Sequence, residues 1–116
     1  MKPRVTLITL GVDDLERAVA FYRDGLGLPT EGIVGKQFEY GAVAFFQLGG
    51  GLKLALWPRA SLAHDTGMKK GPRSATEFSL AHNVATKAEV DEVMAQARKA
   101  GAKIVKNACD TFYGGY

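Results

Sequence analysis

Few side chains in this sequence could do chemistry, and they are scattered along the chain. Glu77 stands out among the carboxylates because it falls in the stretch Thr-Glu-Phe-Ser-Leu, which predicts a strand. A partly buried carboxylate has a raised pKa and can act as a general base, or it can pair with a cationic ligand. An exposed or ion-paired glutamate at a strand edge is the structural alternative. Glu77 is therefore both the candidate catalytic residue and a candidate ligand contact.

The two histidines and the single cysteine give weaker signals. His64 lies beside Asp65 in a polar segment, where a solvated loop side chain is expected, and His82 follows a predicted strand. Cys109 precedes Asp110, with nothing nearby that would activate a thiol. One cysteine cannot form a disulfide within the chain, which agrees with a reducing compartment. None of these three side chains is predicted to be catalytic.

The elements that must position such residues begin with residues 5–28. Residues 5–10 are apolar and β-branched enough for a strand that is buried on both faces. Asp13 and Glu16 have the spacing of a capping box at a helix start, and Gly25 and Gly27 can end that helix. The apolar positions between them recur at helical spacing: Leu15, Val19, Tyr22 and Leu26.

Three further strands are predicted in the first half of the chain. They cover residues 38–40, 42–48 and 52–57 after a turn at 32–37, and glycines 49–51 join the last two as a hairpin. Residues 58–74 are polar and rich in turn residues, which predicts a surface linker. The first half is therefore predicted to be a βαβββ module.

The second half repeats the opening pattern. A strand at 75–81 is followed by the capping box of Thr86 and Glu89, a helix that ends at Gly101, and a strand at 103–106. The apolar stripe of that helix consists of Val90, Val93, Met94 and Ala97. A ferredoxin-like βαββαβ domain is the alternative, but it has too few strands to accommodate residues 38–57.

The order of a strand, Val-Asp-Asp-Leu-Glu-Arg, Phe-Tyr and Gly-Leu-Gly-Leu resembles the opening of the vicinal oxygen chelate superfamily. That superfamily contains glyoxalase I, the bleomycin-resistance proteins and the extradiol dioxygenases. The resemblance implies an α+β fold in which paired βαβββ modules form a curved mixed sheet with a ligand cup. The chain would be a single domain over residues 1–116, with module one at 1–57, a linker at 58–74 and a partial module two at 75–116.

The resemblance also implies where a metal would bind. In the metal-dependent relatives, four ligands come from the first and last strands of each module. Carried over to this sequence, they fall on Leu7, at about Leu54, at about Glu77, and beyond Tyr116. Leucine offers no lone pair, and a catalytic zinc site needs about three protein ligands. We therefore expect no metal site and no cofactor.

Strand alternation predicts the walls of the cup. The side chains expected to face a ligand are Leu7, Thr9, Leu54, Leu56, Glu77 and Ser79. An apolar cavity with one carboxylate is the general form of a small-molecule site. Trp57, Phe112 and Tyr113 fall near strand ends and would line the mouth of the cup, where aromatic faces suit a planar or cationic ligand. Packing in the core is the alternative for each aromatic residue.

The composition and the end of the sequence set further expectations. The chain has 116 residues, of which 47% are hydrophobic and 23% charged, and this composition predicts one globular domain. The N-terminal sequence favours a location in the cytoplasm. The net charge is +3, but basic residues cluster only at 69–73, without the aromatic residues of a nucleic-acid site. Module two lacks its last strands. Either the sequence is part of a longer product, or a homodimer completes the sheet by exchanging a strand or a module.

Three functions are compatible with these patterns. The first is metal-independent binding of a small hydrophobic, aromatic or cationic molecule in the cup, as in resistance or sequestration. The second is an enzyme of the glyoxalase or lyase type that uses Glu77 as a base or a metal ligand. The third is a dimeric interaction module whose cup is filled by its own side chains. The missing ligands favour the first function over the second.

Overall fold

The computed structural model describes residues 1–76 and 78–116, which divide into two compact units, Met1–Pro72 and Arg73–Tyr116. The elements in chain order are β1 (Leu7–Val12), α1 (Leu15–Val19), a π-helical turn η1 (Ala20–Gly25), β2 (Thr30–Val34), β3 (Val43–Gln47), a 3₁₀ turn η2 (Gly49–Gly51), β4 (Lys53–Pro58), α2 (Arg59–Thr66) and α3 (Lys87–Lys99). No helix in the described part of the chain is long and apolar enough to cross a membrane.

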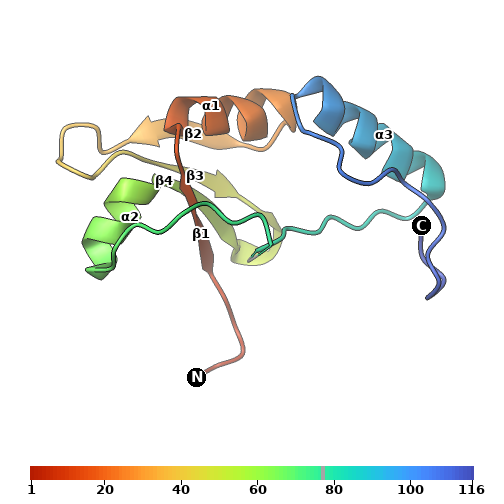
Figure 1. Ribbon diagram of the computed structural model, residues 1–116, viewed down its shortest axis with the longest axis horizontal. Coiled ribbons are helices and arrows are strands. Elements are labelled where there is room, and N and C mark those ends of the chain that lie inside the picture. The colour runs from red at the N-terminus through yellow and green to blue at the C-terminus, as the bar shows by residue number, and fades with distance from the viewer. Residues whose placement is uncertain (77) are drawn as a thin grey trace. The chain divides into compact units, whose positions relative to one another are not determined.

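The first unit is built on a four-stranded mixed sheet with the strand order β1-β4-β3-β2 (Figure 1). β1 runs parallel to β4, whereas β4, β3 and β2 are antiparallel neighbours. The helical segment α1–η1 connects β1 to β2. The first unit therefore has the predicted βαβββ order, and the chain belongs to the α+β class.

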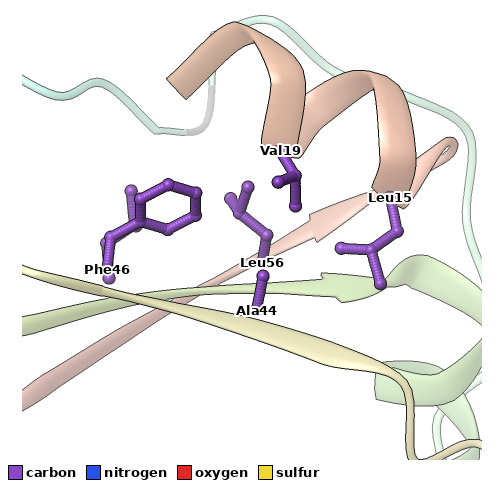
Figure 2. Close-up of a cluster of buried hydrophobic side chains, with 6 residues drawn as sticks. Leu15, Val19, Ala44, Phe46 and Leu56 are labelled. Carbon is purple, nitrogen blue, oxygen red and sulfur yellow. The ribbon is translucent and has the colours of Figure 1, made fainter. Parts of the chain in front are cut away.

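The core of the first unit lies between α1 and one face of the sheet. Leu15 and Val19 point from the helix onto Ala44, Phe46 and Leu56 of the strands (Figure 2). These five side chains are between 0% and 9% exposed. Burial of this apolar surface is the main stabilising contribution to the unit.

The predicted helical stripe is confirmed in this core, and it continues into η1 through Tyr22. The ring centroids of Tyr22 and Phe46 are 5.9 Å apart. Partial burial raises the pKa of the Tyr22 hydroxyl above its ordinary value. The apolar stripe thus predicted correctly which side of the helix faces the sheet.

The predicted boundaries at the start of the chain are wrong by one or two residues. β1 begins at Leu7 and continues to Val12, because it pairs with β4 as far as Pro58. The strand lies at the sheet edge, and Leu7 is 45% exposed, so β1 is not buried on both faces. The longer strand moves the helix start, and Asp14 instead of Asp13 is the N-cap. Its carboxylate accepts a hydrogen bond of 3.0 Å from the backbone N–H of Arg17.

The second strand was also predicted in the wrong place. β2 covers residues 30–34, and residues 38–40 belong to a turn. Gly35 has φ 76°, and a Cβ atom there would collide with the carbonyl oxygen of Gly41. Because neither residue has a side chain, Gly35 and Gly41 can approach closely and form a tight turn between β2 and β3. The residues on either side of this turn then pair as antiparallel strands.

The predicted linker at 58–74 contains a helix. α2 begins directly after Pro58 and ends at Gly67, which has φ 67°. Pro58 is compatible with a helix start, because a helix leaves its first backbone N–H groups without intrahelical partners. The boundary between the two units falls after Pro72, within the segment predicted as the linker.

The second unit contains α3 and irregular backbone. The capping box is confirmed: Thr86 N–H donates to Glu89 Oε2 at 2.8 Å, and Glu89 N–H donates to Thr86 Oγ1 at 3.2 Å. The helix stop at Gly101 is confirmed too, with φ 99°. The strands predicted at 75–81 and 103–106 do not form among the described residues of these segments. A strand forms only when a neighbouring strand satisfies its backbone groups, and neither segment has such a neighbour in the described part of the chain.

The C-terminal residues of the second unit fold against α3 instead. Lys87 pairs with Asp110, and its ammonium group lies 4.8 Å from the centre of the Tyr116 ring. The Tyr116 hydroxyl donates a hydrogen bond of 3.1 Å to Asp91. The hydrogen bond to Asp110 raises the pKa of Lys87, and the hydrogen bond to Asp91 raises the pKa of Tyr116. These exposed contacts connect the C-terminal residues to the helix.

Candidate ligand-binding face of the sheet

The strand register decides which residues face a ligand, and it corrects the predicted cup. β1 and β4 pair Ile8 with Leu54, and Leu10 with Leu56. Leu54 and Leu56 are no more than 1% exposed, and both belong to the core that packs against α1. The prediction that they share a face with Leu7 and Thr9 is wrong. An error of one residue in the phase of a strand moves all its side chains to the opposite face.

The opposite face of the sheet, here called the open face, carries a different set of side chains. Leu7 of β1 is opposite Lys53 of β4, which is opposite Gln47 of β3. In the next row, Thr9 is opposite Ala55, and Ala55 is opposite Phe45. Leu7 and Phe45 are 45% and 37% exposed, which is high for large apolar side chains on a sheet. The open face is therefore a mixed surface of apolar, amide and ammonium groups.

Helix α2 covers one end of the open face. Strand alternation places Gly11 on this face, and a Cβ atom there would lie 3.0 Å from Arg59 Cγ. The absence of a side chain at Gly11 lets α2 approach β1 closely (Figure 1). Arg59 is further held by Asp13, at 3.1 Å, and by the carbonyl oxygen of Gly71. The end of the open face that carries Leu7 and Lys53 lies away from this contact.

Trp57 also lies near the end that α2 covers. Its indole N–H donates a hydrogen bond of 2.9 Å to the carbonyl oxygen of Tyr40. The Tyr40 ring is stacked on His64 of α2, with centroids 4.0 Å apart. Trp57 is half-buried, and its indole N–H is hydrogen-bonded to the turn at 35–41 instead of facing an open pocket. His64 is exposed as expected, but it lies in helix α2 and not in a loop.

A groove of about 460 Å³ crosses the open face between β2 and β4. It is called the β2–β4 groove here, and it is lined by Pro29, Thr30, Glu31, Gly32, Val34, Phe45, Gln47 and Lys53. Thr30 is held in place by its own hydroxyl, which donates a hydrogen bond of 2.6 Å to the Phe45 carbonyl oxygen. The groove therefore combines one aromatic ring, one carboxylate and one ammonium group.

Sequence reasoning missed the main residues of this groove. Leu54 and Leu56 were placed in the cup, although the most apolar side of a strand should face the core. That criterion would have put Lys53 and Ala55 on the open face. Phe45 was not among the predicted contacts, and the signal that could have separated it from the buried Phe46 is the alternation along β3.

The remaining predicted contacts lie in the second unit or outside the described residues. Glu77 lies outside the described residues. Ser79 is exposed and belongs to irregular backbone. Phe112 and Tyr113 are 101% and 74% exposed and form an edge-to-face pair with centroids 5.0 Å apart. Of the predicted cup residues, the described first unit places Leu7 and Thr9 on its open face, together with Trp57 at the end near α2.

The open face does not fit a divalent metal ion of the kind that the resemblance implies for metal-dependent relatives. The positions of β1 and β4 on this face are occupied by Leu7, Thr9 and Gly11 and by Lys53, Ala55 and Trp57. A hydrocarbon, a hydroxyl and an ammonium group do not replace the imidazole and carboxylate ligands of such a site. Within residues 1–76 and 78–116, no group of three or more His, Cys, Asp or Glu side chains could hold a metal ion.

The βαβββ unit with an open sheet face defines a class of fold, and comparison with known proteins identifies the family. The Glyoxalase/Bleomycin resistance protein/Dioxygenase superfamily profile matches residues 4–116. The chain belongs to this superfamily.

Solved structures support this membership. A glyoxalase-related enzyme from Fulvimarina pelagi is 32% identical, with a TM-score of 0.80 over 97% of this chain and 76% of that chain. A lactoylglutathione lyase from Agrobacterium tumefaciens is 24% identical, with a TM-score of 0.57 over 98% and 81%. A glyoxalase/bleomycin resistance protein/dioxygenase family enzyme from Burkholderia phytofirmans is 19% identical, with a TM-score of 0.75 over 94% and 82%. The last two show the fold alone. No curated protein matches the chain.

Proposed function

We propose that this protein binds a small organic molecule on the open face of its sheet, without a metal ion. The observation that carries the proposal is the β2–β4 groove, where the exposed ring of Phe45 lies next to polar side chains. A concave surface with apolar walls and a few polar groups is the usual form of a small-molecule site. The volume of about 460 Å³ is in the range of such sites.

The side chains on the open face support a mode of binding that does not involve a metal ion. Leu7 and Lys53 are neighbours across β1 and β4. Neither side chain is a metal ligand at neutral pH, because leucine has no lone pair and the lysine ammonium group has no free one. The binding energy is therefore expected to come from apolar contact and hydrogen bonds.

The test compares two phenylalanines. Substitution F45A removes the aromatic wall of the groove, and F38A removes a ring that is 67% exposed and lies in the turn outside it. A screen of aromatic compounds by thermal shift and NMR, in buffer with a chelator, identifies a ligand. We expect F45A to weaken its affinity roughly tenfold and F38A to leave it unchanged. Equal effects of the two substitutions, or binding only with added divalent metal, would overturn the proposal.

An enzyme is the second candidate function. It is favoured by the 32% identity to the glyoxalase-related enzyme from Fulvimarina pelagi, and Glu77 is the predicted base. The test is an assay for lactoylglutathione lyase activity, with and without added divalent metal, on the original protein and on E77Q. Turnover that E77Q abolishes supports this candidate. No turnover under either condition, or turnover that E77Q leaves intact, contradicts it.

The proposed location and assembly follow the sequence. We expect a cytoplasmic protein and a homodimer that exchanges a strand or a module. In the described sheet, β1 and β2 are the outer strands and each has one neighbour only. Unpaired strand edges favour pairing with a second chain.

A further inference from the structure

On the open face, Lys53 is the residue whose type is least expected in a β-strand. Lysine is depleted in strands, yet Lys53 lies in β4, which has a neighbouring strand on both sides. It is opposite Leu7 on one side and Gln47 on the other, and its backbone N–H donates to the Thr6 carbonyl oxygen at 3.0 Å. The backbone of Lys53 is thus held firmly in place. Residues that break a local rule in this way are expected at functional sites.

The ammonium group of Lys53 has no carboxylate partner in the described residues. Among those residues, the ion pairs are Arg23–Asp24, Lys36–Glu16, Arg59–Asp13 and Lys87–Asp110. Gln47 offers Lys53 an amide and Leu7 offers it a hydrocarbon surface. A cation in such surroundings is available to an anion that enters the groove.

Glu31 is the other charged residue of the groove, but its position differs. It lies in β2, the outer strand, at the irregularity in the β2–β3 register between Thr30 and Ile33. Two strand spacings, about 9–10 Å of backbone separation, lie between β2 and β4. Phe45, on β3, lies between them. The side chains of Glu31 and Lys53 are both exposed, so water screens both charges, and the two differ in that Lys53 lies on an inner strand and Glu31 on an outer one.

We propose that the β2–β4 groove takes a small organic monoanion whose carboxylate pairs with Lys53 and whose apolar body lies along Phe45 and Val34. This proposal rests on the groove being the ligand site. It replaces the cationic ligand that the sequence suggested, because the inner strand carries the positive charge. Glu31 disfavours a second negative charge on the ligand, so a monoanion fits better than a dianion.

The test uses three probes with one carbon skeleton: phenylbutyrate, its primary amide and phenylbutylamine. NMR titration of the full chain gives the affinity for each. A charge-assisted hydrogen bond contributes more than a neutral one, so we expect phenylbutyrate to bind about tenfold more tightly than the amide. Substitution K53M removes that difference and leaves the affinity for the amide unchanged.

Two matched substitutions separate the local charge from the net charge. K69M removes the same charge from a residue outside the groove and should leave all affinities unchanged. E31Q removes the carboxylate at the outer strand and should leave the phenylbutyrate affinity unchanged or raise it. A cationic ligand would give the opposite signs for K53M and E31Q.

The outcomes distinguish this inference from the proposed function. If the amide or the amine binds in the groove as tightly as phenylbutyrate, the charge assignment is overturned and small-molecule binding stands. If K69M has the same effect as K53M, the pairing with Lys53 is overturned as well. If no probe shifts the resonances of the groove, and the wider aromatic screen finds no ligand there, both proposals fail.

Discussion

The two units of this protein carry the same succession of sequence signals and fold differently. In residues 5–28 and again in residues 75–101, an apolar stretch precedes a capped amphipathic helix that ends at glycine. The first unit forms a paired sheet with the helix packed on it, whereas the described residues of the second form α3 and irregular backbone. A helix satisfies its own backbone groups, but a strand depends on a neighbour. Identical local signals therefore suffice for a helix and not for a strand.

The largest expected effect on stability concerns the core between α1 and the sheet of the first unit. Phe46 is 0% exposed beneath α1, and Phe45, its neighbour in β3, is 37% exposed on the open face. We expect F46A to lower the free energy of unfolding by about 3–5 kcal/mol and F45A by about 1 kcal/mol. Urea denaturation of both variants measures the difference. Similar losses would contradict the assignment of one buried and one open face.

A smaller loss of stability is expected from a substitution in the turn that connects β2 to β3. Gly35 has φ 76° and faces the Gly41 carbonyl oxygen, so G35A should cost about 2 kcal/mol or more. Gly49 provides the control, because a Cβ atom there meets nothing within 4 Å. G49A should change the free energy of unfolding by less than about 0.5 kcal/mol. Thermal and urea denaturation give both values, and an unaffected G35A would show that the turn is not needed.

The smallest expected effect on stability concerns the first turn of α3 in the second unit, where the capping hydrogen bonds join residues that are close in sequence. Thr86 accepts a hydrogen bond from Glu89 N–H at 3.2 Å, and T86A should reduce the stability of α3 by about 1 kcal/mol. T86S retains the hydroxyl and serves as the matched control. Hydrogen exchange of the amides in the first turn of α3 measures the change. Faster exchange in both variants would mean that the hydroxyl of residue 86 does not hold this helix end.

Helices α1 and α3 were predictable from the sequence, α2 was missed, and the strands were predictable only in part. Thr86 and Glu89 are three residues apart, so their hydrogen bonds follow from local chemistry. The position of β2 was mispredicted, because it depends on the close approach of Gly35 and Gly41 across the turn.

The candidate site was less predictable than the fold. Leu7, Leu54 and Leu56 were assigned to one face, but the register places Leu7 on the open face and the two other leucines in the core. Lys53 and Phe45 were missed for the same reason. Which face of β4 is buried depends on the packing of α1, and α1 is distant from β4 in sequence.

The βαβββ order of the first unit and the capping box of α3 could be predicted from the sequence without knowledge of distant contacts. The tertiary structure alone decided the register of β1 against β4. That register placed Lys53 on the open face and two leucines in the core. The physical reason is that helix and cap patterns rest on contacts within a few residues, whereas register depends on distant strands that bury one face together.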